Sequence, residues 1–127
     1  MLPFGNKKIS SNKMVTKAKK SIEINCPVTA TLQLIGGKWK PIIMYCLRTE
    51  VRRFGEIGAR IPSISRKVLT EQLKELEEDK LIVRKQFKEI PPRVEYSLTE
   101  LGKSMAPVFV EMEKWGLEHI LNKQEKG

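Results

Sequence analysis

The sequence predicts one mostly helical α+β domain, in which several helices are followed by a single β-hairpin and then by a last helix. Three observations predict this class. The chain has 127 residues, which is the length of one ordinary domain. Apolar residues recur every three to four positions up to about residue 80, which is typical of amphipathic helices. The spacing then falls to two between Leu81 and Thr99, as in strands, and becomes helical again beyond Thr99.

Three helices are expected in the first half of the chain. The first begins at Cys26 and Pro27, since proline is tolerated in the first helical turn, and ends at Gly36 and Gly37. The second covers roughly 38–48 and carries an apolar stripe of five residues, Trp39, Ile42, Ile43, Cys46 and Leu47. The third is short and contains Phe54, Ile57 and Ile61.

A fourth helix is expected from Ser65 to about Lys80, with Ser65 as its N-cap because a serine oxygen can accept an unpaired backbone N–H. Three leucines at helical spacing predict its buried face, Leu69, Leu73 and Leu76. Its charges run against the helix dipole, since cations occupy its first turn and acids its last turns. A first turn that meets phosphate explains the cations. Pairing of the acids with Lys74 or Lys80 is expected to offset their cost.

A β-hairpin is expected after this helix. Its strands are "IVRKQFKE" and "RVEYSLT", which are joined by the proline-stiffened tip "EIPP". The alternation predicts that the second strand faces the core through Val94, Tyr96 and Leu98. Helices packed together and followed by a hairpin form the winged helix-turn-helix arrangement. In that arrangement the helix before the hairpin enters the DNA major groove, and the hairpin, about residues 82–98, is a wing that reaches the neighbouring groove or backbone.

This arrangement predicts an interface for double-stranded DNA. The predicted contacts are the N-cap, the first turns and outward face of the fourth helix, and two cations of the hairpin: Ser65, Arg66, Lys67, Thr70, Lys74, Lys88 and Arg93. A salt-bridged surface helix is one alternative. A winged helix that contacts only another protein is a second alternative, although the core of a protein interface is normally depleted in lysine.

The charge distribution favours a polyanionic partner. The chain has a formal net charge of +9. Residues 1–25 hold six lysines and one glutamate, and residues 38–93 hold fourteen lysines and arginines with eight acids. Residues 100–127, in contrast, hold four lysines and five acids and are nearly neutral. We therefore expect a basic N-terminal arm at 1–25, followed by a winged-helix DNA-binding domain at 26–127. The arm either touches DNA or a partner subunit, or is a solvated terminus.

The last helix is expected over about 99–122, with Pro107 bending or breaking it near residue 103. An apolar seam steps along it at heptad-like intervals: Leu101, Met105, Val108, Met112 and Trp115. This seam is longer than such a small domain can cover, and it lies on a nearly neutral segment. It therefore predicts a homodimer that is held mainly by this helix.

Other classes of function find little support. No apolar run approaches the ~20 residues that span a bilayer, and the N-terminus lacks the apolar region of a signal peptide, so a cytoplasmic protein is expected. The single histidine, His119, lies far from both cysteines, so no metal site is expected. There is no glycine-rich phosphate loop and no constellation for hydrolysis. We expect neither enzyme activity nor a cofactor.

Several motifs resemble the HxlR family of bacterial transcription regulators, relatives of the MarR group. The segments "CPVTATLQLIGGKWKPIIMYCL", "RRFGEIGARIPSISRKVLTEQLKELEEDKLIVRK" and "PPRVEYSLTELGKSMAPVFVEMEKW" carry the resemblance, which covers roughly residues 26–116. It implies a dimeric winged-helix protein on a pseudo-palindromic operator, with the terminal helices in the dimer interface. The recognition helix would be Ser65 to about Lys80, and the wing Arg84 to Arg93. The family often has glycine where this chain has Lys80, so the helix is expected to end differently here.

The two cysteines have different expected roles. Some members of that family sense oxidants or electrophiles through the cysteine of the Cys-Pro motif, which is Cys26 here. A thiol at an N-cap faces the positive end of the helix, which favours the reactive thiolate. The alternative is that Cys26 only caps the helix and packs in the dimer interface. Cys46 lies on the apolar stripe of the second helix and is expected to be inert. The resemblance thus allows for an oxidant or a small-molecule effector.

Overall fold

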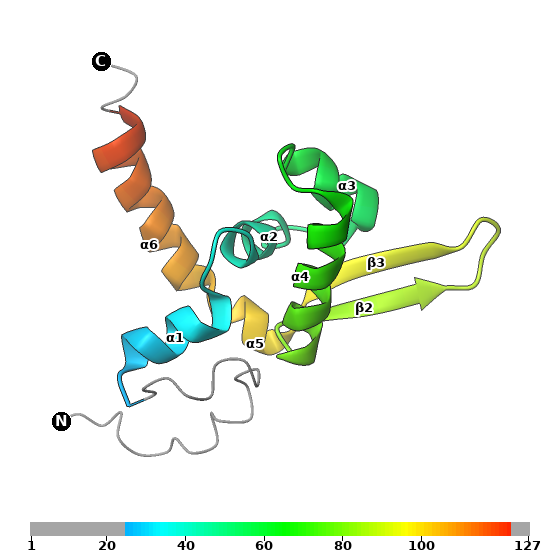
Figure 1. The fold of residues 1–127 in the computed structure, drawn as a ribbon, viewed down its shortest axis with the longest axis horizontal. Helices are drawn as coiled ribbons and strands as arrows, with labels where there is room; N and C mark the ends of the chain where they lie inside the picture. The colour runs from blue at the N-terminus through cyan, green and yellow to red at the C-terminus, as the bar shows by residue number, and fades with distance from the viewer. Residues whose placement is uncertain (1–24, 123–127) are drawn as a thin grey trace.

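The structure, a computed structural model, describes residues 25–122 and confirms the predicted order of helices, hairpin and last helix (Figure 1). The expected N-terminal arm lies almost wholly outside the described residues. The elements are α1 Pro27–Ile35, α2 Lys40–Cys46, β1 Arg52–Arg53, α3 Phe54–Arg60, α4 Arg66–Glu78, β2 Ile82–Phe87, β3 Arg93–Leu98, α5 Glu100–Lys103, α6 Ala106–Gly116 and the π-helical turn η4 Leu117–Leu121.

Local sequence signals set the ends of the helices. Pro27 occupies the first turn of α1, and Gly36 follows its last residue, as predicted. The Ser65 hydroxyl accepts a hydrogen bond from the N–H of Val68 at 3.1 Å, so the predicted N-cap of α4 is confirmed. The second helix is shorter than the predicted 38–48 at both ends.

The core lies between α2, α3, α4 and the sheet. The predicted leucine face of α4 is confirmed, because Leu69, Leu73 and Leu76 are each at most 2% exposed. The face of α2 is rotated from the prediction: Ile42 is 39% exposed, whereas Met44 is fully buried. Burying one such side chain stabilises the fold by about 1.5–3 kcal/mol. The three leucines therefore hold α4 in place with its opposite face outward.

The three strands form an antiparallel sheet in the order β1-β3-β2. β2 and β3 pair along their whole length, starting with Ile82 opposite Leu98, which confirms the predicted hairpin. Tyr96 is buried and Val94 packs against the core, so the inward face of β3 is also as predicted. β1 was not predicted, because a two-residue strand has no periodicity that a pattern could detect.

The end of α4 is a Schellman motif around Lys80. The Leu81 N–H donates to the carbonyl of Leu76 at 3.0 Å, and the Lys80 N–H donates to that of Glu77 at 3.0 Å. Lys80 has a φ of 65°, the left-handed conformation that glycine favours. A lysine therefore holds a conformation that glycine adopts freely, at a cost of about 1–2 kcal/mol, and the expected difference from family members with glycine there stays a prediction.

Thr99 joins the end of α4 to the start of α5. Its hydroxyl donates to the carbonyl of Lys80 at 2.6 Å and accepts from the N–H of Gly102 at 3.0 Å. Its own N–H donates to the carbonyl of Leu81 at 3.1 Å. A Cβ atom on Gly102 would collide with that same carbonyl oxygen. The Thr-x-x-Gly sequence thus fixes the position of α5 against the end of α4.

The C-terminal segment is broken, as Pro107 predicted. α5 ends at Lys103 and α6 begins at Ala106, with Pro107 in the first turn of α6. Leu101 and Met105 are half-buried and pack against the core of their own chain. These two predicted dimer residues thus already pack within one copy of the chain, and their part in a dimer stays a prediction. Beyond the break, α6 projects at the end of the molecule opposite the hairpin, beside α1 (Figure 1).

Candidate nucleic-acid interface

The outward face of α4 is cationic and exposed. The side chains of Arg66, Lys67, Thr70 and Lys74 are all exposed, opposite the buried leucines. Lys67 Nζ lies 4.0 Å from a carboxylate oxygen of Glu71, but both side chains are exposed, so this ion pair contributes little and can yield to a phosphate. The Thr70 hydroxyl donates to the carbonyl of Arg66 at 2.9 Å. While that bond lasts, Thr70 can meet a base edge as an acceptor or through its methyl group.

The first turn of α4 attracts anions through its backbone as well. The first four N–H groups of a helix have no partner within it, and Ser65 accepts a bond from only one of them, that of Val68. The helix dipole adds partial positive charge at the same end. Backbone and side chains together make this turn a place where phosphate is stabilised.

The acidic end of α4 is held by an ion pair that the sequence did not predict. Glu75 pairs with Lys40 of α2 at 2.6 Å, and not with Lys74 or Lys80. Lys40 is only 3% exposed and lies with Met44 on the buried face of α2. The sequence carried one clue: positions 40, 43, 44 and 47 also have helical spacing, but a lysine at the first of them hides the pattern.

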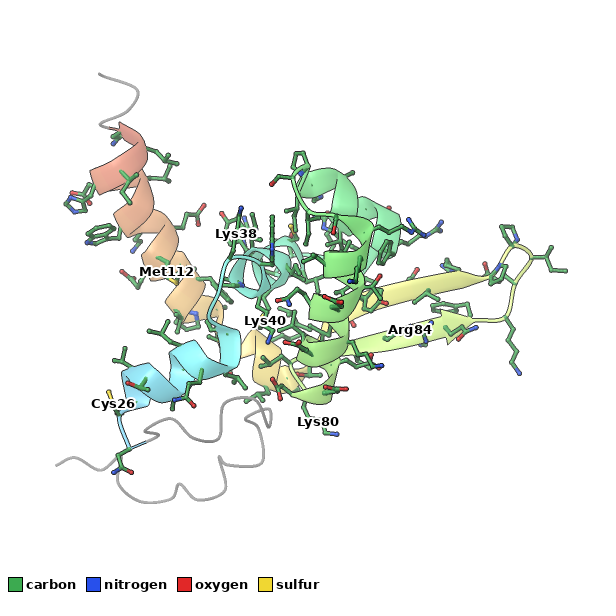
Figure 2. All side chains as sticks on the ribbon, viewed as in Figure 1. Cys26, Lys38, Lys40, Lys80, Arg84 and Met112 are labelled. Atoms are coloured by element: carbon green, nitrogen blue, oxygen red, sulfur yellow. The ribbon has the colours of Figure 1, made fainter. Side chains whose placement is uncertain are left out.

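The wing has more exposed cations than the two that the sequence predicted as DNA contacts. Lys88, which was predicted, is exposed near the tip. Arg84 and Lys85, which were missed, are exposed on β2, and Figure 2 shows Arg84 on the wing. They were missed because alternation predicts one inward face for a strand. Most of β2 instead projects from the body, so Val83 to Gln86 are exposed on both faces.

Arg93 has partners within the wing. Its guanidinium donates to Glu95 at 2.9 Å and to Glu89 at 2.8 Å, and its Cζ lies 3.9 Å from the centroid of the Phe87 ring. Two carboxylates therefore neutralise this predicted DNA contact locally. In the structure, Arg93 thus links β3 to Glu89 near the tip of the hairpin.

Exposed apolar side chains gather on α1 and α6. Val28 and Leu32 of α1 are 66% and 57% exposed, and Met112 and Trp115 of α6 are 52% and 59% exposed. A groove of about 520 Å³ runs between the two helices and is lined by Val28, Leu32, Val108 and Met112 among others. We call Val28, Leu32, Val108, Met112 and Trp115 the apolar face of α1 and α6. An exposed apolar patch of this kind marks an interaction surface.

The two cysteines occupy different environments. Cys26 is the exposed N-cap of α1, far from the wing (Figure 2). Its carbonyl accepts from the N–H of Ala30 at 2.9 Å. Its thiol makes no capping hydrogen bond to α1 within the described residues. Cys46 is buried, and burial raises the pKa of its thiol, although the charges of Arg52 and Arg60 oppose the shift.

Residues 25–122 contain no group of three His, Cys, Asp or Glu side chains that could hold a metal ion. No helix in the same range is long and apolar enough to cross a membrane. His119 is exposed on η4, where its ring centroid lies 4.9 Å from that of Trp115.

The helix order, the exposed cationic face of α4 and the hairpin beside it define a winged helix-turn-helix protein of the kind that binds DNA. Within that class, the chain belongs to the HxlR-like helix-turn-helix family, whose model matches residues 34–124.

Relatives and solved structures agree with this assignment. The HTH-type transcriptional regulator YdeP of Bacillus subtilis is 50% identical over 91 residues, which cover 72% of this chain and 71% of YdeP. The structure of the redox regulator HypR in its oxidised form has a TM-score of 0.71 and 45% identity, over 74% of this chain and 97% of HypR. A MarR-family regulator from Porphyromonas gingivalis W83 has a TM-score of 0.74 and 41% identity, over 78% of this chain and 97% of that one.

Proposed function

We propose that this protein is a transcription regulator that binds a specific double-stranded DNA sequence as a homodimer. The exposed cationic first turns of α4 carry the proposal, because buried leucines hold that helix from behind and exposed cations of the wing stand beside it. α4 lies in the major groove with its N-terminal end first, and the wing lies on the adjacent groove or backbone. The proposed contacts are those predicted from the sequence, Ser65, Arg66, Lys67, Thr70, Lys74, Lys88 and Arg93. To act as one, Arg93 exchanges Glu89 and Glu95 for phosphate oxygens.

The proposed homodimer forms through the apolar face of α1 and α6. A second copy there would cover Val28, Met112 and Trp115, each of which is more than half exposed in one copy. Two winged helices related by a two-fold axis present their recognition helices about 34–36 Å apart, one turn of DNA. The operator is then pseudo-palindromic, like the dimer that binds it.

We further propose that an oxidant controls DNA binding through Cys26. HypR, which is similar to this chain, is a redox regulator, and Cys26 is exposed here. Its thiolate takes the oxygen of hypochlorous acid and chloride leaves, which gives a sulfenic acid. A second thiol, either Cys26 of the other subunit or a small-molecule thiol, then attacks the sulfenic sulfur, and water leaves as the disulfide forms. α1 carries both Cys26 and part of the proposed dimer face, so a shift of α1 changes the spacing of the recognition helices.

A salt titration tests the proposed DNA binding. The wild-type protein first selects a duplex from a randomised pool, and an unrelated duplex of equal length and composition serves as the control. The affinity for the selected duplex should exceed that for the control. It should also fall with salt, since log K changes by about −0.9 per log unit of salt for each phosphate neutralised. Equal affinities, or a flat salt response, would overturn the proposal.

A further inference from the structure

Two arginines, one at the start of α4 and one in the wing, lie over phenylalanine rings, but within residues 25–122 only the one in the wing has hydrogen-bond partners for its N–H groups. Arg93 lies over Phe87 and donates to two glutamates of the wing. Arg66 lies over Phe54, with its Cζ 4.9 Å from the ring centroid. No other residue in the described part of the chain forms an ion pair or a hydrogen bond with the Arg66 guanidinium. The stacked arginine of the wing is therefore held by two carboxylates, whereas the stacked arginine of α4 has no carboxylate partner in the described part of the chain.

Stacking leaves the hydrogen-bonding capacity of an arginine intact. The five N–H donors of a guanidinium lie in its plane, whereas a ring contacts its face. Arg66 can thus remain on Phe54 while its edge donates to a pair of acceptors. Arg66 is also the first residue of α4, where the helix dipole disfavours a cation. The negative face of the ring counteracts that repulsion.

Phe54 is a fixed platform. It is the first residue of α3, is half-buried and packs against the core. The start of α3 is secured by the side chain of Glu56, which accepts from the N–H of Arg53 at 2.8 Å. Arg53 belongs to β1, which pairs with β3. The ring is therefore tied to the sheet and the core, and the flexible Arg66 side chain rests on a rigid surface.

We propose that Phe54 is a positioning residue for DNA recognition, which holds the Arg66 guanidinium at the front of α4 with its edge toward two acceptors on DNA. These acceptors are either guanine O6 and N7 or two phosphate oxygens. The inference rests on the proposed function. An arginine that is ordered before binding loses less side-chain entropy when it binds. Phe54 itself touches no DNA in this arrangement.

A double-mutant cycle on the full chain tests the inference. Binding to the selected duplex is measured for wild type, Phe54→Leu, Arg66→Ala and the double variant. Arg66→Ala should weaken binding roughly 5- to 150-fold if the arginine meets a base edge. Phe54→Leu should weaken it roughly 2- to 5-fold, the range for an exposed cation–π contact. The double variant should bind no more weakly than Arg66→Ala alone. Phe54→Tyr keeps the ring and should bind like wild type.

Phe87→Leu is the matched control, because it removes the ring beneath the other stacked arginine. Its effect should multiply with that of Arg66→Ala. Urea unfolding checks that each variant is folded at the assay temperature. If Arg66→Ala weakens binding to the unrelated duplex equally, Arg66 holds phosphate, and a selective loss points to guanine; both agree with a role for Phe54.

Three outcomes would overturn the role of Phe54. These are wild-type binding by Phe54→Leu, multiplied losses in the double variant, or equal losses for Phe54→Tyr and Phe54→Leu. If the wild-type protein selects no duplex at all, the proposed function fails first and the inference fails with it.

Discussion

Replacing Glu75 by glutamine should destabilise the fold, because it leaves the ammonium group of Lys40 in the interior without its counter-charge. The Lys40 side chain is 4% exposed, and its Nζ lies 2.6 Å from Oε1 of Glu75. Glutamine has the size of glutamate and can accept a hydrogen bond, so the substitution removes charge with little change in shape. Glu75→Gln therefore measures the electrostatic part of the contact between α2 and α4.

The burial of the two partners sets the expected magnitude. Removing one partner of a fully buried ion pair costs about 3–5 kcal/mol, whereas an exposed pair contributes at most about 1 kcal/mol. The Glu75 side chain is 46% exposed, so water partly reaches the pair. We expect an intermediate loss of about 2 kcal/mol in the free energy of unfolding. With m-values of about 1–3 kcal/mol per molar urea, the unfolding midpoint should fall by about 1–2 M.

Lys40→Met is the matched control, because it removes the buried charge and leaves Glu75 to water. It should cost less than about 1 kcal/mol, since a buried ion pair replaced by an apolar side chain is often near neutral. Both variants are unfolded in urea and followed by tryptophan fluorescence at one fixed protein concentration, because a dimer gains stability with concentration. Equal stability of wild type and Glu75→Gln, or a larger loss for Lys40→Met, would refute the reasoning.

Three further predictions follow from the same structure. Lys80→Gly should raise the free energy of unfolding by about 0.5–1 kcal/mol in urea, because glycine adopts the left-handed conformation without strain, whereas Lys80→Ala should bring no gain. Light scattering should give about twice the chain mass of 14.6 kDa for wild type, and Met112→Glu, which places a charge on the apolar face of α1 and α6, should give the monomer mass; a monomeric wild type contradicts the dimer. Hypochlorite should lower DNA binding by wild type and by Cys46→Ser but not by Cys26→Ser, since the buried Cys46 thiol has a raised pKa; an equal response of all three proteins removes Cys26 as the sensor.

The sequence by itself determined the features that depend on neighbouring residues. The spacing of Leu69, Leu73 and Leu76 predicted the buried face of α4, and Ser65 predicted its start. Pro107 predicted the break before α6, and the change of period predicted the hairpin. Each of these follows from a periodic spacing or an end signal within one short stretch of the chain, so the sequence alone is enough to predict it.

Only the tertiary structure decided which charges and rings meet. Lys40 reaches Glu75, Arg66 reaches Phe54, and β1 finds its place beside β3, although none of these pairs has a periodic pattern in the chain. The cationic face of α4 was predicted, but the platform beneath its first arginine was not. A long side chain has many partners within reach, and the packing of the helices decides which partner lies close enough to hold it.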